Sequence, residues 1–258
     1  MKILVTFAME NEFAPWRALR PFRPSDWGKA EVYSAQIGAA EVGVIVTGVG
    51  PRVAGLRAQD AMHANGSSIQ MCVSSGLAGA VKSEYAMGQV LAAKAVRSAM
   101  PGGDRGTNLV ECSGALLSFA ESCGATLVNR FYTSERAIGT AEEKEHIGQL
   151  ADAVEMESFG VLTEAAGAGI PGVAIRAISD LAEEELPLDM NEVFTHEGRV
   201  SVPRVLAQVA RHPGAMPGLM KLGKQNKTAA ESLAQFLDRY VATVAERTAA
   251  LGARGAGQ

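Results

Sequence analysis

Short, almost continuously apolar runs alternate along this chain with segments of helical character, and this alternation limits the fold more than any other feature. Strands buried on both faces form such runs, and helical connections between them place the strands in one sheet. Neither a linker-like run nor a repeat at a fixed period interrupts the 258 residues. The pattern therefore predicts an α/β fold in which helices flank a central mixed β-sheet. We expect one domain over residues 1–250 and a disordered tail over residues 251–258.

The individual elements are predicted from apolar periodicity and from the glycines and prolines that end each run. The predicted strands are Lys2–Ala8, Glu31–Ile37, Val42–Thr47, Ile69–Ser74, Val90–Val96, Ala125–Asn129, Ala153–Met156 and Val173–Ile178. The predicted helices are Glu10–Arg20, Arg52–Ala64, Gly114–Ser122, Ala141–Gln149, Glu157–Ala168 and most of the chain after Pro203. Loops or breaks are expected at Pro21, Pro24, Met100–Thr107, Pro213, Pro217 and Gly223.

Charge and cysteine content exclude several classes of function. Lys plus Arg number 24 and Asp plus Glu 28, a formal net charge of −4, without a dense basic cluster for a nucleic-acid backbone. Cys72, Cys112 and Cys123 have neither metal-ligand nor redox spacing and are expected to be free thiols. The uncharged stretch between Asp60 and Lys82 contains too many polar residues to cross a bilayer. We expect a cytoplasmic protein with no nucleic-acid partner, no membrane span and no metal.

Acidic residues gather where predicted strands end. Glu12 follows the first strand, Glu155 and Glu157 lie at the end of the Ala153–Met156 strand, and Asp180 follows the last strand. Ligands of open α/β sheets bind at the carboxyl ends of strands, so these carboxylates are expected to meet. Carboxylates without a metal indicate acid–base chemistry or a polyhydroxy ligand. Each also has a structural interpretation, because Glu12 and Glu157 would oppose helix dipoles and Asp180 would be an N-cap.

Two glycine-containing segments also follow predicted strands, namely Gly48-Val49-Gly50 and Gly76-Leu77-Ala78-Gly79. Neither has the spacing of a dinucleotide-binding or phosphate-binding loop. Glycines at these positions would still let a ligand approach the backbone closely.

Three segments together resemble hallmark segments of the 5′-methylthioadenosine/S-adenosylhomocysteine nucleosidases, a family of the nucleoside phosphorylase superfamily. They are Ala8-Met9-Glu10-Asn11-Glu12, Ala153-Val154-Glu155-Met156-Glu157 and Arg176-Ala177-Ile178-Ser179-Asp180, in the family's order and near its spacing. The resemblance covers about residues 1–182. The later segment that contains Arg211-His212-Pro213 is similar to the hopanoid-associated nucleosidase branch. The resemblance implies a three-layer α/β/α fold, a small-molecule nucleoside substrate, no cofactor and a homodimer.

The resemblance also implies a role for each matching residue. Asp180 would protonate N7 of a purine, which requires that it carry a proton at neutral pH, and Ser179 would orient the base. Glu157 would bind the ribose hydroxyls with Met156 packed on the sugar, and Glu12 would position or activate the attacking water. Further substrate contacts would come from Glu155, Gly76, Leu77, Ala78, Ala137 and Ile138.

Two positions depart from the family pattern. Leu77 stands where the nucleosidases carry a serine, and Ala137 stands where an aromatic side chain stacks on the base; Leu77 would suit an apolar 5′ substituent. Phosphorylases of the superfamily bind phosphate through arginines, whereas this chain has Ser74 and Ser75 at the usual place and only Arg52 at a nearby strand end. We therefore expect hydrolysis of a 5′-modified, adenosine-type nucleoside. A phosphate-dependent phosphorylase and an inactive nucleoside-binding protein are the alternatives.

Overall fold

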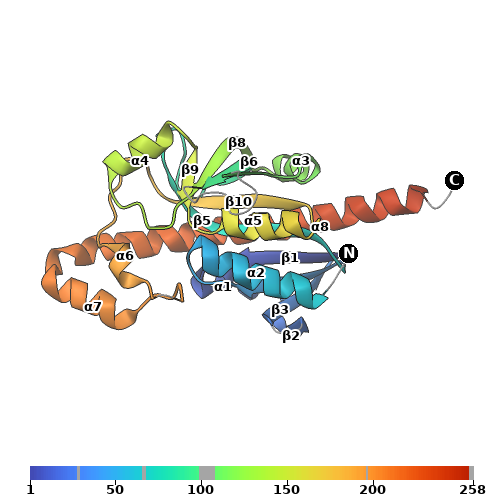
Figure 1. Ribbon diagram of the computed structural model, residues 1–258, viewed down its shortest axis with the longest axis horizontal. Helices are drawn as coiled ribbons and strands as arrows, with labels where there is room; N and C mark the ends of the chain where they lie inside the picture. The colour runs from blue at the N-terminus through green and yellow to red at the C-terminus, as the bar shows by residue number, and fades with distance from the viewer. Residues whose placement is uncertain (28–29, 66–67, 99–107, 196, 256–258) are drawn as a thin grey trace.

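The computed structural model describes residues 1–27, 30–65, 68–98, 108–195 and 197–255, so the predicted loop Met100–Thr107 lies outside the described residues. Helices flank a mixed β-sheet, as the apolar pattern predicts (Figure 1). The strands are β1 Lys2–Phe7, β2 Arg23–Trp27, β3 Ala30–Ile37, β4 Ala40–Val46, β5 Ile69–Ala80, β6 Val90–Ser98, β7 Leu109–Glu111, β8 Thr126–Thr133, β9 Ala153–Glu155 and β10 Gly172–Asp180. The helices are α1 Glu10–Leu19, α2 Pro51–Asn65, α3 Gly114–Ser122, α4 Ala141–Gly148, α5 Ser158–Gly167, α6 Met190–Val193, α7 Val202–Arg211, the 3₁₀ turn η3 Pro213–Ala215 and α8 Met216–Gly255.

Strand β5 joins the two parts of the sheet. The strand order is β10-β6-β8-β9-β5-β1-β4-β3-β2, with β7 paired to β6. In addition, β5 pairs in parallel with β10, and its last residues pair antiparallel with β9. Strand β10 also pairs with β6, β6 with β8, and β8 with β9. Together with the two pairings of β5, these contacts close the strands into a ring. The apolar pattern of the sequence predicts the mixed sheet but not this closure.

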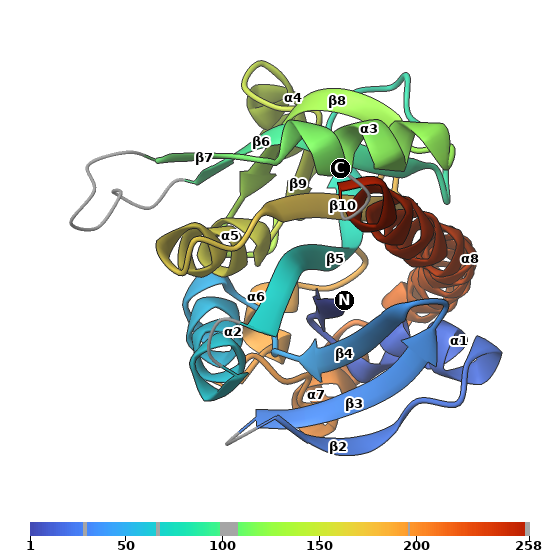
Figure 2. The ribbon, with the colours of Figure 1, turned by 90° about the vertical axis from the view of Figure 1, so that its right-hand side faces the viewer.

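Two groups of helices cover the sheet from opposite sides (Figure 2). On one side, α2 and α5 pack over a buried cluster that includes Ala54. On the other side, α1, α3 and α8 contribute to the largest cluster, in which Trp16 and Phe236 are almost fully buried. The contact between α2 and α5 depends on glycine, since a Cβ on Gly160 would lie 1.9 Å from the carbonyl oxygen of Pro51. This close packing explains part of the high glycine content.

Strand β7 was not predicted, β8 continues past Asn129 to Thr133, and β2 and β5 differ from the sequence prediction for identifiable reasons. Arg23–Trp27 forms β2, although Pro24 indicated a loop; β2 is the last strand of the sheet, and edge strands tolerate a residue without an N–H group. Strand β5 continues past Ser74 to Ala80 instead of giving way to a glycine loop. Gly76 lies inside this strand with a φ of +147°, a value that favours glycine.

The C-terminal part is more regular than predicted. Helix α8 runs unbroken for 40 residues from Met216 to Gly255. Pro217 does not interrupt it, because this proline lies in the first turn, where a backbone N–H has no helical partner. Residues 251–255, expected to be part of a disordered tail, are therefore helical, whereas 256–258 lie outside the described residues. In the described ranges, α8 and all other helices lack the combination of length and apolarity that a membrane span requires. The three cysteines are free thiols, as expected.

Candidate active site

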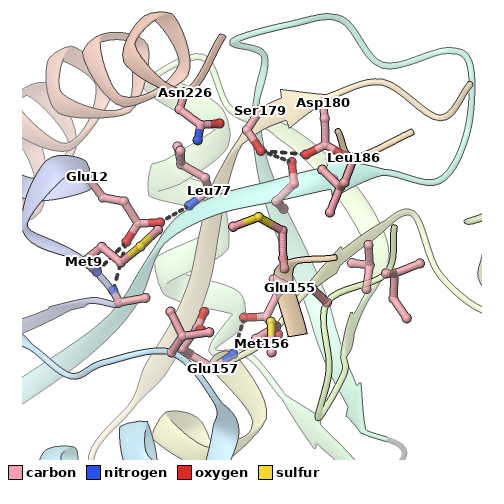
Figure 3. A pocket seen from close by; sticks show the side chains of 18 of the residues that line it. Met9, Glu12, Leu77, Glu155, Met156, Glu157, Ser179, Asp180, Leu186 and Asn226 are labelled. Atoms are coloured by element: carbon pink, nitrogen blue, oxygen red, sulfur yellow. Dashed lines mark hydrogen bonds between the residues drawn. The ribbon is translucent and has the colours of Figure 1, made fainter. Parts of the chain in front are cut away.

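The ends of β1, β5, β9 and β10 meet at a cavity of about 170 Å³ (Figure 3). The predicted site residues that line it are Glu12, Leu77, Ala78, Ala137, Ile138, Glu155, Met156, Glu157, Ser179 and Asp180. Gly76 is the exception: it contacts Glu12 instead, since a Cβ on Gly76 would lie 3.3 Å from Oε1 of that side chain. Among the described residues, no cluster of three or more His, Cys, Asp or Glu could hold a metal ion.

Glu12 is held in the cavity by backbone N–H groups. Its Oε2 accepts hydrogen bonds from the backbone N–H groups of Ala8 (2.9 Å) and Met9 (3.0 Å), and Oε1 accepts one from Leu77 (3.1 Å). Burial raises the pKa of Glu12, whereas the positive charge of Arg176 and these three N–H groups oppose the rise. A carboxylate with a raised pKa is a stronger proton acceptor, which suits a group that removes a proton from water.

Arg176 joins the carboxylates of Glu155 and Glu157 in a buried cluster. The arginine side chain has no exposed surface, and its Nη2 lies 2.5 Å from Oε2 of Glu155, 3.6 Å from Oε2 of Glu157 and 3.4 Å from Oγ of Ser74. The sequence analysis included Arg176 in a family-like segment but gave it no role, because its partners come from other strands. Since this guanidinium group pairs with the buried Glu155 carboxylate and lies beside the carboxyl group of Glu157, the cluster depends on the arginine.

Glu155 acts within the protein more than toward a ligand. Its Oε1 accepts a hydrogen bond from the Thr133 hydroxyl. Its Oε2 accepts hydrogen bonds from the backbone N–H groups of Glu157 (2.9 Å) and Ser158 (2.8 Å), besides its ion pair with Arg176. A carboxylate has about four acceptor sites, and these contacts occupy most of them. Glu155 therefore positions Arg176 and the start of α5.

The pKa of Glu157 is strongly raised by its surroundings. Burial, together with the neighbouring charge of Glu155 and more weakly that of Glu12, raises the pKa of Glu157 to about 8, against the opposing effect of Arg176. Its Oε1 accepts a hydrogen bond of 3.2 Å from the backbone N–H of Gly50. In the unliganded protein Glu157 therefore carries a proton at neutral pH.

The substitution Glu157→Gln is expected to remove a pH-dependent loss of stability. Because the folded-state pKa of about 8 exceeds the ordinary value of 4.5, the folded state holds a proton that the unfolded state lacks between these values. The contribution of Glu157 to the free energy of unfolding is therefore fully present below the ordinary pKa of 4.5. It decreases as pH rises toward about 8, by at most about 1.4 kcal/mol per pH unit. Urea unfolding across this pH range should show wild-type protein losing stability relative to the variant. Parallel pH profiles would contradict the assignment.

Asp180 has a buried partner that the sequence analysis missed. Lys144 is fully buried, and its Nζ lies 2.5 Å from Oδ2 of Asp180. The same ammonium group donates hydrogen bonds to the carbonyl oxygens of Leu181 (2.7 Å) and Glu184 (2.9 Å). The Ser179 hydroxyl donates to Oδ1 of Asp180 at 2.9 Å. The expectation that Asp180 is simply a protonated acid in a dry cleft omitted this ion pair, since α4 has the polar sequence of an exposed helix.

The wall near Ala137 is closed by α6. The side chain of Asn191 accepts a hydrogen bond from the N–H of Ala137 (2.7 Å) and donates one to its carbonyl oxygen (3.2 Å). Arg136 also lines the cavity and forms a 2.5 Å ion pair with Glu143. The sequence analysis considered Arg52 as the nearest arginine, but Arg52 does not line this cavity. Arg136 and Asn191 were not predicted because both reach the site through tertiary packing.

Together, the fold and the cavity define an α/β protein with a carboxylate-rich cavity at the ends of its strands. A family model described as the phosphorylase superfamily matches residues 2–211, and the chain belongs to this family. The match confirms the superfamily that the three sequence segments indicated.

Solved structures with the same fold include three from two bacteria. Futalosine hydrolase of Helicobacter pylori strain 26695 is 20% identical, with 93% of this chain and 97% of that chain covered and a TM-score of 0.71. The 5′-methylthioadenosine/S-adenosylhomocysteine nucleosidase of Helicobacter pylori is 21% identical, with the same coverage and a TM-score of 0.72. The S-adenosylhomocysteine nucleosidase of Streptococcus pyogenes is 17% identical, with 94% and 97% covered and a TM-score of 0.73.

Proposed function

We propose that the protein hydrolyses the N-glycosidic bond of a purine nucleoside of the adenosine type with a modified 5′ position, releasing the free base and the sugar. The observation that carries this proposal is the convergence of Glu12, Glu157 and Asp180 on one cavity. Fold neighbours named as nucleosidases and a hydrolase support it. A homodimer, as the resemblance implies, and a cytoplasmic location, as the composition indicates, are part of this proposal.

In the proposed reaction, the buried Lys144–Asp180 pair supplies a proton that Asp180 delivers to N7 of the purine, and the bond between C1′ and N9 breaks with its electron pair going to the base. Water attacks C1′ and gives a proton to Glu12, so that the water oxygen becomes the new sugar hydroxyl. The positive charge that develops on the sugar favours the carboxylate form of Glu157 beside it. Ser179 fixes the orientation of Asp180, and solvent afterwards returns one proton to the Lys144–Asp180 pair and takes one from Glu12.

The apolar lining of the cavity supports an apolar group at the 5′ position. Met9, Val49, Leu77, Phe194 and Leu222 contribute to the wall. Burial of apolar ligand surface against these side chains is favourable. The same side chains offer no hydrogen-bond partner to a polar substituent. The departures at Leu77 and Ala137 therefore fit a changed substrate at least as well as a loss of activity.

The charges around the cavity favour water over phosphate as the acceptor. Of the described residues that line it, Arg136 alone carries a positive charge, and the cations behind the wall, Lys144 and Arg176, are already paired with Asp180 and Glu155. A phosphate dianion placed near carboxylates is repelled in a partly desolvated site, whereas neutral water is not. Arg136 is the observation that keeps the phosphorylase alternative open, although Glu143 already pairs with it.

Release of base is therefore expected to proceed at the same rate with and without inorganic phosphate. The protein would be incubated with adenosine, 5′-methylthioadenosine and adenosines that carry longer 5′-alkylthio groups, and adenine and sugar products would be separated by chromatography. The expected products are adenine and the free sugar. A strict phosphate requirement with formation of a sugar 1-phosphate would establish the phosphorylase instead, and no release from any nucleoside would favour the inactive binding protein.

A further inference from the structure

Apolar side chains that face solvent gather in one region of this molecule. Nine large apolar residues are exposed among the described residues, and five of them are close in sequence: Val200 (42%), Val202 (63%), Leu206 (63%), Met216 (46%) and Met220 (60%). The other four, Leu19, Leu56, Leu109 and Leu150, lie singly and far apart in the sequence. Single exposed apolar residues are ordinary, whereas a cluster of them marks an interaction surface.

Helix α7 turns its apolar side toward water. Val202 and Leu206 are four residues apart and therefore lie on one face, and both are 63% exposed. The buried residue of the helix is instead a polar one, Gln208, whose amide donates to the carbonyl oxygen of Asp189 at 2.9 Å. An amphipathic helix of a core has the opposite arrangement. The apolar face of α7 is thus available to something outside the described chain.

The same region is basic, although the protein is acidic. From Val200 to Lys227 the sequence contains no Asp or Glu, and its Lys and Arg residues are Arg204, Arg211, Lys221, Lys224 and Lys227. The segment therefore carries +5, while the whole chain carries −4. The side chains of Arg211 (66%), Lys221 (63%) and Lys227 (77%) are largely exposed, and each has an acidic side chain outside this segment within ion-pair distance.

This surface adjoins the cavity. Helix α7 and the start of α8 lie at the same end of the molecule, joined by η3 (Figure 1). Met190 and Phe194, just before α7, line the cavity, as do Leu222 and Asn226 in the early part of α8. Any partner that binds this surface would therefore lie beside the candidate active site.

We propose that the exposed surface formed by α7, η3 and the first turns of α8 binds an anionic lipid membrane. A helix with an outward apolar face and flanking basic residues lies in the interface of a bilayer, where its apolar side chains insert and its cations contact acidic headgroups. A second copy of the chain fits less well, because a two-fold contact through this surface would bring the cations of this acid-free segment close to the same cations of the other copy. The inference does not depend on the proposed hydrolysis.

Cosedimentation with vesicles tests the proposal. The full chain would be mixed with vesicles of phosphatidylcholine alone and of equal parts phosphatidylcholine and phosphatidylglycerol, at low and high salt. Binding is expected to the anionic vesicles, to weaken in high salt and to be much weaker with phosphatidylcholine alone. Absence of binding to anionic vesicles, or equal binding to both compositions, would overturn the proposal.

Matched variants locate the contact. Val202→Gln with Leu206→Gln should lower binding to the anionic vesicles by about tenfold or more, because two inserted apolar groups are lost. Leu56→Gln on α2 removes a leucine that is equally exposed (64%) and should leave binding unchanged. Hydrolysis of a soluble nucleoside in the same samples reports separately on the cavity. If the double variant binds vesicles like wild type, this surface is not the membrane contact. If the substitutions instead change the oligomeric mass measured by light scattering, the surface is a contact between copies of the chain.

Discussion

Asp180→Asn is expected to lower kcat/KM for base release by about 10²–10⁴-fold, the usual contribution of a positioned proton donor. The amide has nearly the same shape as the carboxyl group but no acidic proton to give to the purine. Release of adenine by wild type and variant, measured with the same nucleoside, provides the comparison. Asp60→Asn, an exposed carboxylate on α2, is the matched control and should retain full activity. Unchanged release in Asp180→Asn would show that another group supplies the proton.

The partner of Asp180 makes a sharper version of this test possible. Because Lys144 is fully buried, Asp180→Asn leaves its ammonium group without a carboxylate, and this loss of pairing lowers stability as well as activity. Lys144→Met alone should reduce kcat, but it should add no further loss of activity when Asp180 is already asparagine. The double variant should also unfold at a higher urea concentration than Asp180→Asn. Independent, additive effects on kcat would contradict the view that Lys144 acts through Asp180.

Arg176→Met is expected to destabilise the protein by about 3–5 kcal/mol, the usual cost of leaving a buried ion pair without one partner. The guanidinium group and the Glu155 carboxylate are both fully buried, and Glu157 lies near the same nitrogen. Removing the arginine leaves two buried carboxyl groups without a compensating charge. Urea unfolding measures the change, which should shrink at acidic pH, where the carboxyl groups are protonated.

Two further variants separate this effect from a general loss of packing. Arg176→Met combined with Glu155→Gln should recover part of the stability, because the buried negative charge is removed with its partner. Arg211→Met, at an arginine whose side chain is 66% exposed, should change the free energy of unfolding by no more than about 0.5 kcal/mol. A single Arg176→Met variant as stable as wild type would mean that the cluster does not hold the site together.

Much of the candidate site could be predicted because it depends on local chemistry at strand ends. Glu12, Glu157 and Asp180 each follow a short apolar run, and strands that run side by side bring such positions to one edge of the sheet. The same local signals predicted the β3–β4 hairpin and most helices. The superfamily resemblance was confirmed, while the catalytic roles of these residues stay predictions.

The residues that the sequence did not reveal depend on distant packing. Lys144 lies on a helix with an otherwise polar sequence, and it is buried where α4 meets the end of β10 and the loop that follows that strand. Arg176 lies within a predicted apolar strand, and its neighbours in sequence do not indicate a partner. Its partners come from β5 and β9. Gly76 was expected at the cavity wall, but the continuation of β5 turns it toward Glu12. Periodicity predicts elements and cannot say which polar groups of separate elements meet.

The pairing of β5 with β10 has a consequence for how the chain becomes active during synthesis. Residue 72 pairs with residue 172 in the register of these strands, so the ring cannot close until the ribosome has delivered β10. Contacts this far apart in sequence form slowly, and meanwhile β5 has an unsatisfied edge that invites pairing with other chains. Because Leu77 on β5 and Asp180 on β10 face the same cavity, a nascent chain has no site before this late event. Recovery of activity would therefore report the last step of folding, and molecular chaperones would matter most while β5 awaits its partner.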